Sequence, residues 1–410
     1  NIFTRERNLT VMVAGFLIAG ILFNMHYQYS YEKDYLSEFT DSGEALEKLE
    51  TGVDRAVLST DDPSVYRYDQ MDTNSSENSS MQMGTNSTAY YFSVASSSIA
   101  NFFDEMYLNT PWEQHYNNLD GRTILDRLAS VKYFVVKKGK ESDLPYGYSR
   151  LSGEAEKNGK TYLAYADEDA LPLGYTYDSW ISREDYDKMT VTEKQQALLQ
   201  GVVLDDSSLP ETETHFNDRE VSYYPSDCKG CRLKNGKVGV THEKAQLKLV
   251  FEGEENAETY LITEGLDYEG LSPREMISDK KWSKMTTYEQ NKLLEENSNW
   301  RYWKESQKAS IQIGGRFLKK TIQIFTDKYN AYSGKHNFLC NTGYSEKGRH
   351  TITLTFENTG VYSFDSLKIY CQPMTDIDSQ SSKLGEEVLP DVKIGNNGIN
   401  GRISLSDTKA

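Results

Sequence analysis

A single long apolar segment stands out in a chain that is otherwise hydrophilic. It runs from Leu9 to Phe23 and extends to Met25, in a sequence with a mean hydropathy of −0.67. About 20 apolar residues span the hydrocarbon core of a bilayer, so this segment is near the short end for a membrane-spanning helix. The rest of the chain must fold in water, and the segment is predicted to tether it to a membrane.

The flanks of this segment predict its orientation. Arg5 and Arg7 precede it, whereas tyrosines follow it at positions 27, 29 and 31. Positive residues favour the cytoplasmic side and tyrosines favour the interface, which places the residues after about 31 outside the cytoplasm. A cleaved signal peptide has the same polarity, but the apolar run is followed by His26-Tyr-Gln-Tyr rather than by a small-x-small cleavage site. We therefore predict a retained transmembrane helix within residues 1–31.

The charge balance argues against nucleic acid as a partner. The 410 residues carry 62 Asp and Glu against 45 Lys and Arg, for a net charge of −17, and they contain no Lys/Arg-rich run. Phosphate contacts need clustered cations, so nucleic-acid binding is not expected. An anionic polymer would also be repelled, unless a local basic groove received it.

The length of the chain is sufficient for two or more hydrophobic cores.

Residues 32–217 read as a mixed α/β domain. A helix predicted over Thr123–Ala129 leads directly into an apolar strand from Val131 to Val136, and the same order recurs over Lys194–Leu204. Thr190 and Glu193 have the spacing of a capping box, which predicts a helix start. Further helices are expected over Ile99–Met106 and, with amphipathic character, over Glu44–Leu58.

Residues 218–374 alternate apolar and polar side chains with a period of two, as strands of a β-sandwich do. Leu247, Leu249 and Phe251 form one such set, and others lie at 352–356 and 367–371. A helical insert is expected near 273–304, where Thr286 and Glu289 repeat the capping-box spacing. Residues 375–410 read as a polar, loop-like tail that leads to a strand-like stretch at 403–405.

The predicted fold class is therefore α+β. It has one N-terminal transmembrane helix, a mixed α/β layer, and an antiparallel β-sandwich with a helical insert.

Four cysteines leave several arrangements open. Cys228 and Cys231 stand in a turn between strands, where a local disulfide is favoured over a redox or metal site, because no helix start or matching second pair accompanies them. Cys340 and Cys371 each share a strand face with apolar residues. They can form a cross-link between strands or remain two buried thiols.

No catalytic or cofactor motif is present. The histidines are scattered without paired spacing, and no phosphate loop, nucleophile elbow or dinucleotide fingerprint occurs. We expect no metal and no cofactor. Pairs of acids such as Asp185 and Asp187 could serve a glycosidase, but they arise by chance in so acidic a chain.

Aromatic residues beside polar ones give the best candidates for a binding site. The 29 tyrosines exceed what a core requires. Sugars are held by flat aromatic faces, with Asp, Asn and His bonding the hydroxyls. Two clusters fit this description, although aromatic residues in β-rich domains also serve as structure. The carbohydrate candidates are Tyr175, Tyr177, Asp178 and Trp180 in one cluster, and Tyr332, His336 and Asn337 in the other.

Several phrases of the sequence resemble the YfhO family of bacterial membrane proteins. They are LPLGYTYDSWIS at 171–182 with KQQALLQGVVL at 194–204, VYRYD at 65–69, LDRLASVKYFVV at 125–136, NAYSGKHNFLCNTGY at 330–344 and GVYSFD at 360–365. They keep the family order over most of the chain. None of them is a catalytic signature.

This resemblance implies a polytopic membrane protein like the glycosyltransferases that use lipid-linked sugars. Such a protein would transfer sugar from a lipid-linked donor to a cell-surface polymer such as lipoteichoic acid. The expected location is the bacterial cell membrane. The reacting groups would lie in a membrane part outside this chain, so no catalytic residue is assigned here. The chain itself would hold the acceptor glycan.

Two other classes of function stay open. The chain can be a membrane-tethered, non-enzymatic module that binds glycan or protein. It can also be an exported thiol oxidoreductase, which rests on the Cys228–Cys231 pair alone.

Overall fold

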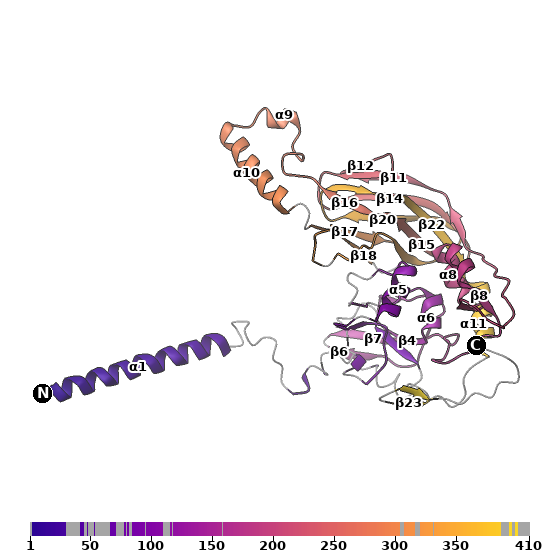
Figure 1. The fold of residues 1–410 in the computed structure, drawn as a ribbon, viewed down its shortest axis with the longest axis horizontal. Coiled ribbons are helices and arrows are strands. Elements are labelled where there is room, and N and C mark those ends of the chain that lie inside the picture. Colours follow the sequence, from indigo (N-terminus) through magenta and orange to yellow (C-terminus); the bar gives the residue numbers. More distant parts are fainter. Residues whose placement is uncertain are drawn as a thin grey trace. The chain divides into compact units, whose positions relative to one another are not determined.

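The computed structural model has two compact units, residues 1–50 and 51–410, which are described separately (Figure 1). The structure describes residues 2–29, 42–44, 47, 53, 66–70, 78, 80–81, 84–94, 96–109, 115–116, 118–157, 159–303, 307–315, 320–330, 332–386, 393–395 and 398–400. The amphipathic helix expected over 44–58 lies outside these residues except at three positions. The strand-like stretch at 403–405 lies wholly outside them.

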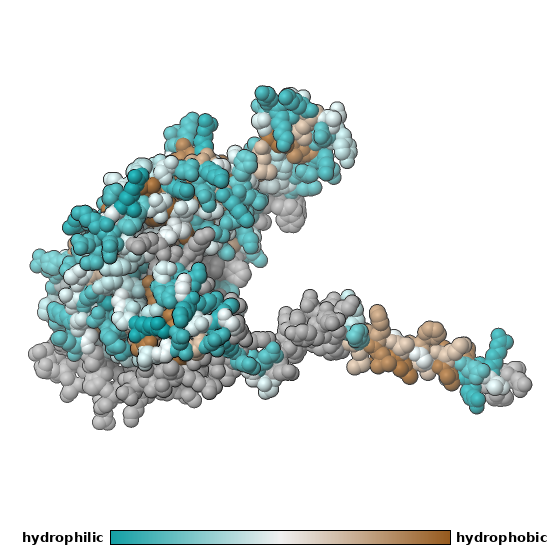
Figure 2. All heavy atoms as spheres, turned by 180° about the vertical axis from the view of Figure 1, so that it is seen from behind, coloured by the Kyte–Doolittle hydropathy of each residue, from teal (hydrophilic) through white to brown (hydrophobic). Residues whose placement is uncertain are grey.

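Helix α1, Ile2–Tyr29, carries the apolar segment. Within its stretch Thr4–Gln28, an 18-residue window has a mean hydropathy of 1.9 and no buried residue, and this stretch is the one candidate membrane span among the described residues. At 1.5 Å per residue a helix of 28 residues is about 42 Å long, which exceeds the roughly 30 Å of hydrocarbon in a bilayer. Figure 2 shows it as a largely hydrophobic rod.

A five-stranded sheet forms the first layer of the second unit. Its central strand, β4, is buried on both faces: Tyr133 and Val135 join one cluster, and Phe134 and Val136 join the other. β1 pairs with β4 in parallel, and the other pairings are antiparallel. The strands are β1 (Arg67–Gln70), β4 (Val131–Lys137), β7 (Lys160–Ala166), β5 (Ser149–Arg150) and β6 (Ala155–Lys157).

Short helices and strand pairs pack beside this sheet. The helices expected near residues 99–106, 123–129 and 191–197 are confirmed, and β9 follows the last of them as expected. These elements are α5 (Ser97–Glu105), α6 (Thr123–Leu128), the 3-10 turn η2 (Glu141–Asp143), α7 (Arg183–Lys188), α8 (Val191–Ala197), β2 (Tyr90–Tyr91), β3 (His115–Tyr116), β8 (Trp180–Ser182) and β9 (Val202–Leu204).

The capping box at α8 is confirmed. The backbone N–H of Thr190 donates to Glu193 Oε2 at 2.7 Å, and the N–H of Glu193 donates to Thr190 Oγ1 at 3.3 Å. Replacing an N-cap threonine by alanine removes the acceptor, so we expect Thr190→Ala to lower the free energy of unfolding by about 0.5–2 kcal/mol. Urea unfolding measures this change. Thr287→Ala, at an exposed first-turn position of α10 that makes no cap, should leave stability nearly unchanged; equal losses in both variants would contradict the capping role.

The β-sandwich is confirmed, and its core contains the residues that alternate in the sequence. Leu247, Leu249 and Phe251 are buried in one cluster with Ile369 and Cys371 of the facing sheet. The strands of its three sheets are β10 (Arg219–Val221), β22 (Ser366–Pro373), β15 (Ala257–Glu264) and β19 (Phe338–Ser345); β11 (Tyr223–Lys229), β14 (Ala245–Gly253), β20 (Gly348–Phe356), β17 (Lys308–Gly314) and β18 (Lys320–Phe325); and β12 (Cys231–Lys234), β13 (Lys237–Val240), β21 (Gly360–Ser363) and β16 (Asp267–Gly270).

The helical insert is also confirmed. It consists of α9, Asp279–Trp282, and α10, Thr287–Trp303. The second capping box is present, because the N–H of Thr286 donates to Glu289 Oε2 at 2.7 Å and the N–H of Glu289 donates to Thr286 Oγ1 at 3.3 Å.

The polar tail after residue 374 differs from the expectation of a loop. It begins with helix α11, Thr375–Gly385, which buries Ile377 and Leu384 against Leu171 and Leu199. Only a few apolar residues mark its inner face, and a buried serine, Ser381, completes it. Further along the tail are the strands β23 (Lys393–Gly395) and β24 (Gly398–Asn400), which pair with each other.

Buried polar contacts join the α/β layer to the sandwich. Glu258 of β15 accepts a hydrogen bond from Thr123 Oγ1 of α6 at 2.7 Å. Asn341 of β19 donates to the Gly121 carbonyl oxygen at 2.7 Å. Because residues 51–410 form one compact unit, the two layers share a common interior.

Candidate functional site

The hydroxyl groups of the two tyrosines in the LPLGYTYDS segment donate hydrogen bonds to backbone carbonyl oxygens. Tyr175 donates to the Leu128 carbonyl oxygen at 3.2 Å, and Tyr177 donates to that of Leu198 at 2.7 Å. Their rings meet edge-on, with centroids 5.7 Å apart. Burial raises the pKa of both phenols, so they stay neutral at physiological pH. What the two residues offer to a ligand is therefore ring surface.

Both rings line a cavity of about 510 Å³, which we call the aromatic cavity. This volume is within the range of about 300–1,000 Å³ that is usual for small-molecule sites. A stack of Tyr90 on buried Tyr116, with centroids 4.5 Å apart, stiffens one wall. The cavity is lined by Arg67, Ser87, Thr88, Tyr90, Ser98, Ile99, Phe102, Phe103, Leu119, Leu125, Leu128, Ala129, Tyr175, Tyr177 and Leu198.

Arg67 is the cation of the aromatic cavity. Its guanidinium donates to the Ala129 carbonyl oxygen, and burial lowers its pKa although Asp69 opposes that effect. Asp69 itself is fully buried and accepts hydrogen bonds from the hydroxyl of Ser87 and from the backbone N–H and hydroxyl of Thr88. Among the described residues no carboxylate forms an ion pair with Arg67. The remaining N–H donors of Arg67 can therefore receive an anion.

A second hollow, the polar cavity, has a volume of about 410 Å³ and shares Tyr177 with the first. Its wall carries three carboxylates, two amides and one lysine. It is lined by Thr176, Tyr177, Asp178, Ser179, Leu199, Gln200, Glu211, Thr212, Glu213, His215, Gln380, Lys383 and Leu384. The segment around Tyr177 therefore lines both cavities.

The other carbohydrate candidates lie outside both cavities. Trp180 is part of β8, where its backbone pairs with Val202. In the second cluster, Tyr332 and His336 share a hydrogen bond of 3.2 Å, and Asn337 accepts the backbone N–H of Gly265 at 3.0 Å. These residues make local contacts, and neither the aromatic cavity nor the polar cavity includes them.

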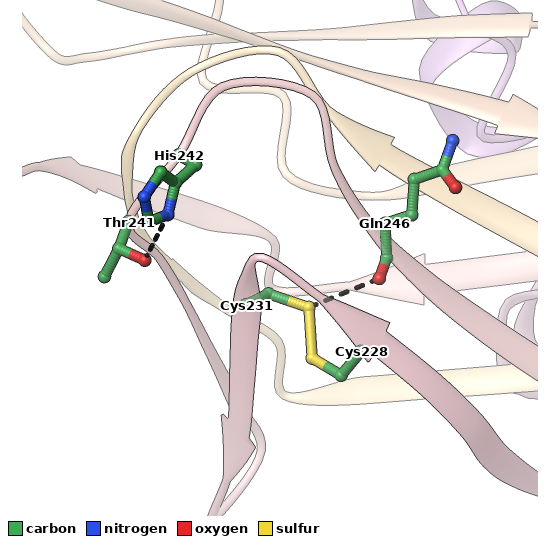
Figure 3. The surroundings of a disulfide bond; sticks show 5 residues. All are labelled: Cys228, Cys231, Thr241, His242 and Gln246. Carbon is green, nitrogen blue, oxygen red and sulfur yellow. Dashed lines mark hydrogen bonds between the residues drawn. A yellow bond between two sulfur atoms is a disulfide. The ribbon is translucent and has the colours of Figure 1, made fainter.

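The cysteines are divided between one disulfide and two thiols. Cys228 and Cys231 form a disulfide across the turn from β11 to β12, where Gly230 has a φ of +76°, and His242 lies nearby (Figure 3). Cys340 and Cys371 are both free and buried, and burial raises the pKa of each thiol. Within the described part of the chain, no group of three or more His, Cys, Asp or Glu side chains is arranged to hold a metal.

Sequence reasoning did not single out Arg67, Tyr90 or Gln380. Arg67 stands within the VYRYD phrase, so the resemblance contained a signal for it. Tyr90 and Gln380 come from segments far from Tyr177 in the chain, and only the fold brings them to the cavity walls.

Comparison with known families gives the identity of the whole chain. The family described as "Bacterial membrane protein YfhO" matches residues 2–410. The chain belongs to the YfhO family. The resemblance seen in the short phrases is thereby confirmed, and with it the character of a bacterial membrane protein.

One relative of this YfhO-family chain is the "Uncharacterized protein YfhO" of Bacillus subtilis (strain 168). The two are 24% identical over 251 residues, which is 58% of this chain and 28% of that protein. The chain thus corresponds to little more than a quarter of the relative's length.

Two solved structures share a weak likeness with the fold. They are a cycloalternan-forming enzyme from Listeria monocytogenes in complex with a pentasaccharide substrate, and an exo-β-1,3-galactanase from Phanerochaete chrysosporium with galactose. Both have a TM-score of 0.19 and 9% identity. The first covers 59% of this chain and 18% of its own, and the second covers 58% and 43%. A likeness this low bears on neither fold nor function.

Proposed function

We propose that this chain is the extracytoplasmic, acceptor-holding part of a membrane glycosyltransferase-like protein. The full protein transfers sugar from a lipid-linked donor to a cell-surface polymer such as lipoteichoic acid. Residues after about 31 lie outside the cytoplasm, and the reacting groups belong to a membrane part outside this chain.

The aromatic cavity is the observation that carries the proposal. An acceptor polymer built from phosphates and polyols needs a cation for its charge and flat faces for its C–H groups. Arg67 supplies the cation, and its planar guanidinium suits a phosphate geometrically. The rings of Tyr90, Tyr175 and Tyr177 supply the faces. In a chain of net charge −17, such a local cation is what lets an anionic polymer approach.

The test is the sugar content of lipoteichoic acid purified from cells that make the full-length protein. We expect Arg67→Gln to lower this content roughly tenfold, the usual weight of a charge-assisted contact. Arg67→Lys, which keeps the charge, should retain most of it. Arg150→Gln, at an exposed arginine that pairs with Glu154, serves as the control.

Two readouts keep the result interpretable. The melting temperature and the membrane level of each variant show whether Arg67→Gln folds, because Arg67 also bonds to the Ala129 carbonyl oxygen. A folded Arg67→Gln protein with unchanged sugar content would refute the acceptor role. Unchanged sugar content in cells lacking the protein altogether would favour the non-enzymatic binding module.

A further inference from the structure

The polar cavity is built from four segments that the fold locks together. They are the turn after Tyr175, the link from α8 to β9, residues 211–215, and helix α11. Gln200 pins two of them, because its amide oxygen accepts from the N–H of His215 and its amide nitrogen donates to the His215 carbonyl oxygen, both at 2.8 Å. The N–H of Thr212 donates to the Trp180 carbonyl oxygen at 2.7 Å. The cavity is therefore a preformed hollow.

Close approach in the wall adds to this rigidity. A Cβ atom on Gly201 would lie 2.5 Å from Thr212 Oγ1 and 3.1 Å from a side-chain carbon of Ile181. Only glycine allows the link between α8 and β9 to pack so tightly against the segment that carries Thr212. The position of the cavity wall is thus fixed by backbone packing.

Two residues of the wall each have a buried side-chain oxygen without a hydrogen-bond partner. Thr212 Oγ1 and Gln380 Oε1 are both buried, and neither is paired. Buried polar atoms are nearly always satisfied, and an unsatisfied one costs about 1–3 kcal/mol. These two come from separate segments that line the same hollow. A ligand rich in hydroxyl groups carries the donors that these oxygens lack, and the Gln380 amide meets them once its side chain turns toward the hollow.

The charges of the wall define what kind of ligand fits. Asp178, Glu211 and Glu213 are exposed carboxylates, and Lys383 is the one lysine among the lining residues. Carboxylates accept hydrogen bonds from sugar hydroxyls and repel phosphate groups. Tyr177 adds a ring whose hydroxyl is already bonded, so it offers an apolar face. The arrangement suits a neutral sugar and disfavours an anionic one.

We propose that the polar cavity is a binding site for a neutral hexose unit, separate from the aromatic cavity. The carboxylates and the Gln380 amide hold the sugar hydroxyls, and the ring of Tyr177 contacts the C–H face. Its volume, about 410 Å³, is ample for one hexose and extends beyond it. This site goes beyond the acceptor role of Arg67, and either can fail without the other.

The experiment is a saturation-transfer NMR titration of the complete 410-residue chain in detergent micelles with two probes, D-glucose and glucose 6-phosphate. In the Arg67→Gln chain, which lacks the cation of the aromatic cavity, we expect saturable binding of glucose and at least tenfold weaker binding of glucose 6-phosphate, because the two probes share the ring and differ in the charged phosphate. Gln380→Ala should weaken glucose binding about tenfold. Ser379→Ala, an exposed α11 residue that does not line the cavity, is the matched control.

Further variants separate this proposal from the function proposed above. Glu213 is exposed, so Glu213→Gln should fold as the native chain does. By removing one carboxylate of the wall, it should reduce the difference in affinity between glucose and glucose 6-phosphate. Arg67→Gln should leave glucose binding unchanged. The proposal is overturned by any of three results: glucose shows no saturable binding, glucose 6-phosphate binds the Arg67→Gln chain as well as glucose does, or a folded Gln380→Ala chain binds glucose as the native chain does.

Discussion

Replacing Arg127 by methionine should lower the free energy of unfolding by about 3–5 kcal/mol, the usual cost of leaving a buried charge without its partner. The Arg127 side chain is 1% exposed and its partner Asp167 is 2% exposed, with Nε and Oδ2 separated by 2.7 Å. Methionine can fill the space of the arginine stem but cannot compensate the Asp167 carboxylate. Urea unfolding of the purified chain measures the loss.

Arg127 also ties α11 to α6. Its Nη1 lies 2.8 Å from Asp378 Oδ1 and donates to Ser381 Oγ at 3.3 Å, both on α11. We therefore expect α11 to detach first in the variant, which amide hydrogen exchange over residues 375–385 would show as faster exchange. The loss should occur because the Arg127 pair is buried. Arg150→Met removes an arginine from an exposed ion pair, so this variant should have nearly the same free energy of unfolding as the native protein.

A double variant distinguishes lost pairing from lost packing. Adding Asp167→Leu to Arg127→Met removes the stranded carboxylate, so the double variant should be more stable than Arg127→Met alone. If the double variant is less stable than the single one by the full cost of a second core substitution, the loss comes from packing rather than from an uncompensated charge.

Local rules predicted the elements of the fold well where a few neighbouring residues decide the outcome. The boxes at Thr190 and Thr286 depend on side chains three residues away, and both are present. The alternation in β14 and β20 reports directly which side chains face the core. Helix α11 was not predicted, because its buried face consists of a few apolar residues and a serine. The hydrophobic periodicity of this segment is therefore weak.

Local sequence rules predicted only part of the candidate site. Tyr175 and Tyr177 were identified because they are neighbours in a family-like phrase, and both line a cavity. Arg67 of the aromatic cavity comes from β1, and Gln380 and Lys383 of the polar cavity come from α11; these elements lie more than a hundred residues away on either side. No spacing rule connects such segments, because their meeting depends on how the layers pack.

As the pH rises above 5, the native chain should lose stability relative to the variant Asp126→Asn. Both carboxylate oxygens of Asp126 are buried and lack a hydrogen-bond partner. Burial, and then the nearby carboxylates Asp69 and Glu258, raise its pKa well above the ordinary value. Folding therefore takes up a proton at Asp126 whenever the unfolded chain has released it.

The sign of the effect follows from this proton uptake. In the unfolded chain Asp126 ionises near pH 4, whereas the folded state keeps the proton until its raised pKa is reached. Between those two values the native chain loses about 1.4 kcal/mol of stability per pH unit from this residue, and the uncharged amide of the variant loses none. The other buried acids, including Asp69 and Glu258, are present in both chains, so the difference between the chains isolates position 126.

Urea unfolding at intervals from pH 5 to pH 8 measures this difference. We expect the advantage of Asp126→Asn to grow as the pH rises, while Asp205→Asn, at an exposed acid, keeps the native slope. A constant offset between Asp126→Asn and the native chain at every pH would mean that Asp126 is ionised in the folded state and that a buried counter-charge stabilises it. Lys320, the described cation that opposes the shift, would then be the residue to replace next.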